Sequence, residues 1–259
     1  YSVVTHGFTV DADGMKMSKS KGNVVAPQKV MNMYGADVLR LWVAATDYRT
    51  EMSVSDEILK RIADAYRRIR NTSRYLLSNL NDFEPEKDSI PFSEMLDLDK
   101  WVCEHASRVQ KQIINAYDNY QFHQIYQILH QFCVIEMGGF YLDIIKDRQY
   151  TTKKNSVIRR SAQTAMYHLI QMLIRWLAPI MSYTADEIWK YIPGDHGISV
   201  FLEDWYELKA KDDNSEFRKI RWETIISVRD EVNKQLEALR SDGTIGSSLD
   251  AEVSVYCNE

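Results

Sequence analysis

Residues 14–23 read Gly-Met-Lys-Met-Ser-Lys-Ser-Lys-Gly-Asn, a short segment with three lysines and two serines between two glycines. Flexible ammonium groups and hydroxyl donors lie together here, those of Lys16, Ser18, Lys19, Ser20 and Lys21. The glycines at either end, Gly14 and Gly22, permit tight turns that let a backbone close over an anion. The segment therefore predicts a loop that binds polyphosphate. A solvated basic turn without a ligand is the alternative.

The order of residues 16–20, Lys-Met-Ser-Lys-Ser, decides between these interpretations. It resembles, residue for residue, the KMSKS signature of class I aminoacyl-tRNA synthetases. Residues 5–11 alternate like a strand and lead into Asp-Ala-Asp-Gly, so a β-hairpin is predicted to carry the loop. As in that family, a Pro-containing turn and a Tyr-Gly-Ala-Asp sequence follow, at 34–37.

Later segments narrow the resemblance. Residues 46–48, 67–72 and 140–148 are similar to isoleucyl-tRNA synthetases of bacterial type, and less similar to the valyl and leucyl enzymes, which are the nearest alternative. The His-x-Gly-His motif of the family is absent, and the chain starts with Tyr1. The resemblance thus implies the C-terminal part of a larger enzyme, with nucleotide-binding and editing domains upstream.

The resemblance also implies a chemistry. In this family the amino acid carboxylate attacks the α-phosphorus of ATP, pyrophosphate leaves, and the aminoacyl group passes to tRNA. Lys19 and then Lys16 are the expected catalytic contacts to pyrophosphate, with Ser18 and Ser20 completing the ATP-binding set. The expected substrates are isoleucine, ATP with Mg²⁺, and tRNA(Ile). The chain alone is expected to be inactive.

Composition favours a mainly α fold. Of 259 residues, 45% are hydrophobic and only 10 are Gly and 5 Pro, so turn formers are scarce. Helical patterns cover 27–34, 36–45, 53–80, 97–117, 122–145, 156–177 and 216–240, and 251–257 is strand-like. We expect a loop segment at 1–52, a helical anticodon-binding bundle at 53–195 and a small mixed α/β subdomain at 196–259.

Two glycines interrupt the pattern at 122–145. Gly138 and Gly139 each cost about 1 kcal/mol of helix stability relative to alanine. A close crossing of two helices is the expected reason for them.

Basic residues gather in two places, although the net charge is −5. The first is a helical stripe of three arginines, Arg67, Arg70 and Arg74. The second lies between two predicted helices and contains Lys153, Lys154, Arg159 and Arg160. Both suit tRNA phosphates. For the arginine stripe, the alternative is ion pairing with acidic residues on a solvated helix face. For the second cluster, it is a polar turn between helices without a ligand.

The cysteines and the lengths of the apolar runs limit the possible metal and membrane roles. Cys103, Cys133 and Cys257 are odd in number and far apart, which predicts reduced core thiols and no zinc site in this chain. No metal site of any kind is predicted. No apolar run has the length of a membrane span, so a cytoplasmic protein without a membrane partner is expected.

Two rival functions come from other classes. A non-catalytic helical RNA-binding module would use the lysine loop for phosphate backbone contacts only. A helical scaffold for protein partners would not bind RNA. The RNA-binding module predicts RNA binding that ATP does not change, and the scaffold predicts no RNA binding. An RNA-binding assay with and without ATP therefore separates them.

Overall fold

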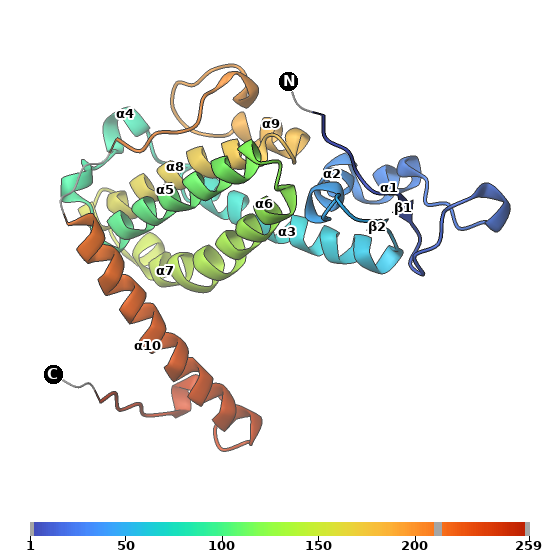
Figure 1. Cartoon of the computed structure of the whole chain (residues 1–259). Coiled ribbons are helices and arrows are strands. Elements are labelled where there is room, and N and C mark those ends of the chain that lie inside the picture. Colours follow the sequence, from blue (N-terminus) through green and yellow to red (C-terminus); the bar gives the residue numbers. More distant parts are fainter. Residues whose placement is uncertain (1–2, 210–213, 257–259) are drawn as a thin grey trace. The chain divides into compact units, whose positions relative to one another are not determined.

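A computed structural model describes residues 3–209 and 214–256. The chain forms two compact units, Tyr1–Ala210 and Lys211–Glu259. Helices dominate both, so the mainly α fold class is confirmed (Figure 1). The helices of the first unit are α1 (Pro27–Tyr34), α2 (Ala36–Ala45), α3 (Asp56–Ser78), α4 (Pro85–Asp88), α5 (Asp97–Asp118), α6 (Phe122–Gln131), η3 (Phe132–Tyr141), α7 (Leu142–Thr151), α8 (Val157–Leu177) and α9 (Ser182–Trp189).

The strand before the lysine loop pairs differently from the prediction. β1 (Thr9–Val10) forms a parallel pair with β2 (Met52–Ser53), and the expected hairpin is reduced to a single antiparallel bridge between Val10 and Lys16. The chain approaches very closely beside this sheet, because a Cβ at Gly7 would lie 2.0 Å from the carbonyl oxygen of Thr50. The parallel partner is about forty residues away in sequence, so local turn chemistry did not reveal it.

Helix α8 is the central member of the bundle, as its apolar pattern predicts. It starts at Ser156, whose side chain accepts a hydrogen bond from the Arg159 backbone amide, and most of its residues are buried. Helices α3, α5, α7 and α9 all contact it, and α5 lies alongside it in Figure 1. Its packing therefore positions these four helices of the bundle.

A buried carboxylate joins four elements around α8. Asp99 on α5 is fully buried and accepts hydrogen bonds from the hydroxyls of Tyr141 (2.8 Å) and Ser161 (2.6 Å) and from both Nη atoms of Arg148 (3.0 and 2.9 Å). Both carboxylate oxygens of Asp99 accept hydrogen bonds, and the guanidinium of Arg148 balances its negative charge.

The predicted helix crossing at Gly138 and Gly139 is wrong. Both glycines are exposed and lie in η3, a π-helix continuous with α6 and α7. A Cβ at Gly138 would lie 3.3 Å from the Cys133 carbonyl oxygen, which belongs to the same helix. The glycines therefore accommodate the wider π-helical turn, not a neighbouring helix.

The stretch Phe122–Thr151, formed by α6, η3 and α7, is long and apolar enough to cross a membrane. It is a member of the bundle, however, and contacts α2, α3, α5 and α8. Ile125, Leu129 and Met137 are fully buried there. Its apolar character is therefore explained by packing within the protein.

Helix α2 is fixed to the bundle through the start of α9. Met181, at the N-cap position of α9, makes no capping hydrogen bond through its side chain. The carboxylate of Asp37 on α2 caps the helix instead. It accepts hydrogen bonds from the amide and the hydroxyl of Thr184 (both 2.6 Å). Arg40, one turn further along α2, donates to the carbonyl oxygens of Pro179 and Ile180 (2.9 and 2.8 Å). The segment that carries the lysine loop is thus tied to the bundle.

Among residues 214–256, the second unit contains α10 (Ser215–Ser241) and a 3-10 turn, η5 (Ser248–Asp250). Residues 251–256 form no strand, so the strand prediction is wrong for this part, and Cys257 lies outside the described residues. Residues 197–206 belong to the first unit, where Trp189 donates to the Gly197 carbonyl and Gln110 to that of Tyr206. The functional boundaries at 1–52, 53–195 and 196–259 stay predictions.

Replacing the capping carboxylate tests this connection. Asp37→Ala removes a charged cap and leaves the buried Thr184 amide without a partner, so the free energy of unfolding should fall by about 2–4 kcal/mol. Urea denaturation measures it. Asp64→Ala, which removes an exposed carboxylate paired with Arg67, is the control and should cost under about 1 kcal/mol. Equal losses for the two variants would contradict the assigned role of Asp37.

Candidate functional site

The lysine loop forms a short ordered turn. Residues Lys19–Lys21 make one 3-10 turn, with Ser18 before it in an extended conformation. The Ser18 hydroxyl accepts from the Lys21 amide at 3.3 Å and lies 3.1 Å from the Ser20 hydroxyl. Gly22 closes the turn in the left-handed conformation, φ 69°, where a side chain would be strained. The loop therefore has a defined shape.

An aspartate and an asparagine hold this shape from within. Asn23 donates from its side chain to Asp11 (2.7 Å) and accepts from the Ser18 amide (2.9 Å). The other oxygen of Asp11 accepts from the amides of Asp13 (3.0 Å) and Met15 (2.8 Å). The hydrogen bond from Asn23, followed by that from Met15, lowers the pKa of Asp11, so the carboxylate stays charged. The two ends of the lysine loop are thereby joined.

Met17 attaches the loop to the body of the protein. Its side chain is half-buried and lines an apolar pocket of about 300 Å³, together with Val25, Val30 and Trp42. The Val25 amide lies 3.5 Å from its sulfur. Met17 thus contacts the body of the protein, while the preceding Lys16 is exposed.

Lys16, Lys19 and Lys21 are not buried, and none forms an ion pair or hydrogen bond through its side chain with another described residue. The structure therefore places the four predicted ATP-binding residues, Lys16, Ser18, Lys19 and Ser20, in and directly before one ordered turn. Sequence reasoning missed Asp11 and Asn23 as positioning residues. The Asp-x-Asp-Gly turn signature and the asparagine directly after Gly22 were the available signals.

The arginine stripe on α3 is exposed along its length. Arg67 pairs with Asp64 one turn earlier, as the alternative interpretation expected. Arg70 and Arg74 form no ion pair or hydrogen bond with any other residue that the structure describes. They line a pocket of about 400 Å³ between α3 and α9. Two of the three guanidinium groups are thus available for an anion.

The second basic cluster divides into buried and exposed members. Arg159 makes two hydrogen bonds to the Asp82 carboxylate (2.7 and 2.9 Å), and its side chain is 13% exposed. Arg160, 8% exposed, donates to the Asp82 carbonyl, Gln163 and Asn155, and pairs with Asp88 at 3.2 Å. Both guanidinium groups hold α8 to the 79–88 segment. The prediction that they face RNA does not fit this placement, because their donors are already bonded.

Lys153 and Lys154 remain exposed in the turn before α8. The Lys154 ammonium lies 3.8 Å from Asp82, and its side chain is 67% exposed. A surface ion pair of this kind contributes little to stability, so both lysines are accessible to an anion.

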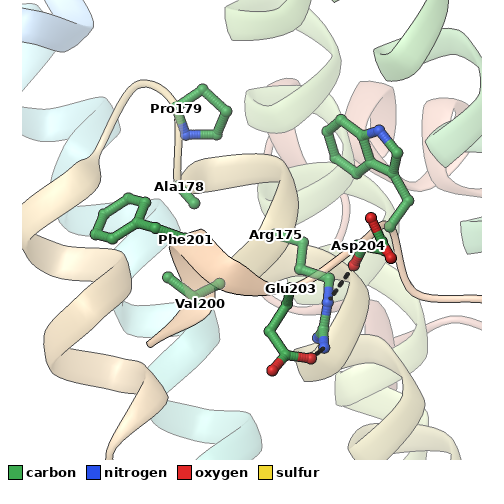
Figure 2. Close-up of a pocket in the computed structure, with 8 residues that line it drawn as sticks. Arg175, Ala178, Pro179, Val200, Phe201, Glu203 and Asp204 are labelled. Carbon is green, nitrogen blue, oxygen red and sulfur yellow. Dashed lines mark hydrogen bonds and ion pairs between the residues drawn. The ribbon is translucent and has the colours of Figure 1, made fainter. Parts of the chain in front are cut away.

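A further cavity, of about 450 Å³, lies at the end of α8 between Pro179 and residues 200–205 (Figure 2). Arg175 projects into it but donates to the Asp204 carbonyl (2.8 Å) and to Glu203 (3.1 Å). Its guanidinium also stacks on the rings of Trp189 and Tyr206. Burial lowers the pKa of Arg175, and Glu203 counteracts this. The cavity therefore contains a structural cation that is already paired.

Metal-binding groups are scarce. Within 3–209 and 214–256, no group of three or more His, Cys, Asp or Glu residues could hold a metal ion. Cys103 and Cys133 are buried free thiols, and burial raises the pKa of Cys133 to about 12. Their prediction as reduced core thiols is confirmed.

Comparison with known protein families agrees with the lysine turn and the helical bundle. Residues 1–55 match the family of class I tRNA synthetases for I, L, M and V, and residues 99–255 match the anticodon-binding domain of tRNA ligases. The second match covers more than half of the chain, which therefore belongs to this tRNA ligase family.

The relatives in sequence are isoleucine–tRNA ligases. That of Nitrosococcus oceani is 60% identical over 258 residues and that of Saccharophagus degradans 61% over 257, each covering 99% of this chain. The resemblance to isoleucyl-tRNA synthetases is thus confirmed. The chain spans only 27% and 28% of the lengths of these two relatives.

Solved structures support the fold. A leucyl-tRNA synthetase of Agrobacterium radiobacter, in a ternary complex with tRNA, matches with a TM-score of 0.56 and 18% identity over 83% of this chain and 24% of its own. A methionyl-tRNA synthetase of Mycobacterium tuberculosis matches with a TM-score of 0.57 and 21% identity over 71% and 36%. At these identities, the likeness concerns the fold alone.

The Asp82–Arg159 pair predicts a pH dependence of stability. The hydrogen bonds from Arg159, more than those from Gln163, lower the pKa of Asp82 from 3.8 to about 2. Since the folded pKa lies below the unfolded one, the pair stabilises fully above about pH 5, and this stability is lost as the pH falls toward 2. Asp82→Asn removes the charged pair and should reduce the free energy of unfolding at pH 7 by about 1–2 kcal/mol. The free energy of unfolding of the variant should also decline less between pH 5 and 2. Urea unfolding at several pH values measures this. A parallel decline in the wild type and the variant would contradict the assignment.

Proposed function

We propose that this chain supplies the pyrophosphate-binding loop and the tRNA-binding bundle of an isoleucine–tRNA ligase. The ligase activates isoleucine with ATP and transfers it to tRNA(Ile) in the cytoplasm. The observation that carries this proposal is the ordered loop at residues 16–21, whose lysines form no ion pair within the described chain. Sequence identity of about 60% to isoleucine–tRNA ligases supports the choice of amino acid over the valyl and leucyl alternatives.

Charge development explains why the reaction needs these groups. As the isoleucine carboxylate attacks the α-phosphorus, the bond to the β-phosphate oxygen breaks and negative charge builds on the leaving pyrophosphate. An ammonium group that contacts this charge in the transition state lowers the barrier. Lys19, at the start of the 3-10 turn, is the first candidate and Lys16 the second. The Ser18 hydroxyl holds the turn by accepting from the Lys21 amide, and we assign it and the neighbouring Ser20 hydroxyl to binding of ATP.

Mg²⁺ would enter with ATP. The loop itself offers ammonium and hydroxyl groups, and Asp11 is already bonded to Asn23 and two backbone amides. These groups do not form a Mg²⁺ site, which needs several free oxygen ligands. We therefore assign this chain no part in holding the ion.

The proposed tRNA contacts are the exposed cations of the bundle. Arg70 and Arg74, with Arg67 beside them, form one helical stripe on α3, and Lys153 and Lys154 lie in the turn before α8. Phosphate neutralisation by such side chains supplies a large share of the affinity for a nucleic acid. Arg159 and Arg160 act through the fold instead.

Replacement of Lys19 tests the catalytic assignment. In a full-length isoleucine–tRNA ligase that contains this segment, Lys19→Ala should slow isoleucine-dependent exchange of pyrophosphate into ATP by about 10²- to 10³-fold, with little change in the Kd for ATP. The matched control is Lys29→Ala, an exposed lysine on α1 outside the loop. An unchanged exchange rate would remove Lys19 from the mechanism. The 259-residue chain alone should show no exchange.

Replacement of the arginine stripe tests the RNA contacts. Changing Arg67, Arg70 and Arg74 together to Gln should weaken tRNA binding and reduce the log–log slope of affinity against salt by about 0.7–0.9 for each phosphate that is no longer neutralised. Binding titrations at several salt concentrations measure the slope, and Lys60→Gln on the same helix is the control. An intact slope with a lowered Tm would instead assign the arginines to packing.

A further inference from the structure

The pocket between α3 and α9 combines two kinds of surface. Leu77 and Ile188 form an apolar wall, and Tyr191, 70% exposed, stands at its edge just after α9. Asn81 and Glu187 supply an amide and a carboxylate. The hydroxyls of Tyr66 and Thr184, 3.0 Å apart, connect the two helices independently of the pocket. The pocket is thus a defined, solvent-open recess.

We propose that this pocket binds one unstacked base of the tRNA, with Tyr191 stacking on the base and Arg70 and Arg74 binding the flanking phosphates. The inference rests on the proposed function, because it assumes that tRNA reaches this face of the bundle. It adds a specific site, the chemical class of its ligand and a residue, Tyr191, that neither the sequence pattern nor the family match assigns.

Size and charge favour a nucleotide over other ligands. A volume of about 400 Å³ lies within the range of about 300–1,000 Å³ usual for small-ligand pockets. Arg70 and Arg74 have no partner among the residues that the structure describes, so two guanidinium groups remain at the pocket wall for an anion. Single-stranded RNA offers both a flat apolar face and adjacent phosphates, which matches this pairing of aromatic and cationic side chains.

The carboxylate of Glu187 indicates which part of the nucleotide enters. An acceptor-only group repels a phosphate but accepts a hydrogen bond from an exocyclic amino group. The base is therefore expected inside and the phosphates outside, next to the arginines.

A fluorescent base tests the proposal on the 259-residue chain. The probe is an RNA hairpin with the anticodon stem and loop sequence of tRNA(Ile), in which 2-aminopurine replaces one loop base at a time. With wild-type protein at saturation, the emission of one loop position should change because its base stacks on Tyr191. Tyr191→Ala should remove that change and weaken binding roughly 5- to 150-fold, whereas Tyr191→Phe should retain both.

The chain offers a matched control. Tyr183 lies on α9, is 71% exposed and does not line the pocket, so Tyr183→Ala should bind like the wild type. Arg70→Gln and Arg74→Gln should weaken binding, yet leave the emission change intact at saturation. Thermal unfolding shows whether each variant is folded.

Two results would overturn the inference, and they differ in scope. If the hairpin binds but Tyr191→Ala behaves like Tyr183→Ala, the base pocket is wrong while the RNA-binding function stands. If the wild-type chain does not bind the hairpin at all, the tRNA contacts of the proposed function are wrong and the base pocket falls with them.

Discussion

Helix α8 lies in the interior of the bundle along nearly its whole length, so each charged or polar side chain on it needs a partner there. Ser161 donates to the buried Asp99, Arg159 and Arg160 bind the segment around Asp82, and Arg175 bonds to residues 203–204. This requirement fixes the neighbours of α8 and removes three arginines from the set that can meet a ligand. The cations left in solvent are then the informative ones for function.

In the lysine loop, too, the residues that hold the structure differ from those left in solvent. Asp11, Asn23 and Met17 satisfy the polar and apolar requirements of the turn from inside. The three lysines are consequently free of internal partners among the described residues, and a preorganised cluster of positive charge results. Preorganisation matters because charge that is already in place costs no rearrangement when pyrophosphate leaves. The capping carboxylate Asp37 ties this segment to the bundle that is proposed to bind tRNA.

Much of the fold and of the loop could be predicted from local chemistry. Helices α1 and α2 have the predicted bounds, and Ser55 and Ser156 cap α3 and α8 as such residues do. Three of the failures share a physical cause, namely partners distant in sequence. The β2 partner of β1, Asp82 opposite Arg159, and Asp37 at the start of α9 are about 40, 77 and 147 residues away. The glycines at 138–139 failed for another reason, because a π-helix has no simple sequence signature.

The central claim is that internal pairing separates the arginines that hold the bundle from those that bind tRNA. Chemical modification with phenylglyoxal, read by mass spectrometry with and without tRNA(Ile), tests it most directly. We expect Arg70 and Arg74 to react in the free chain and to be protected by tRNA, while Arg159 and Arg160 stay unreactive in both states. Protection of Arg159 and Arg160 by tRNA, with Arg70 and Arg74 unaffected, would contradict the account.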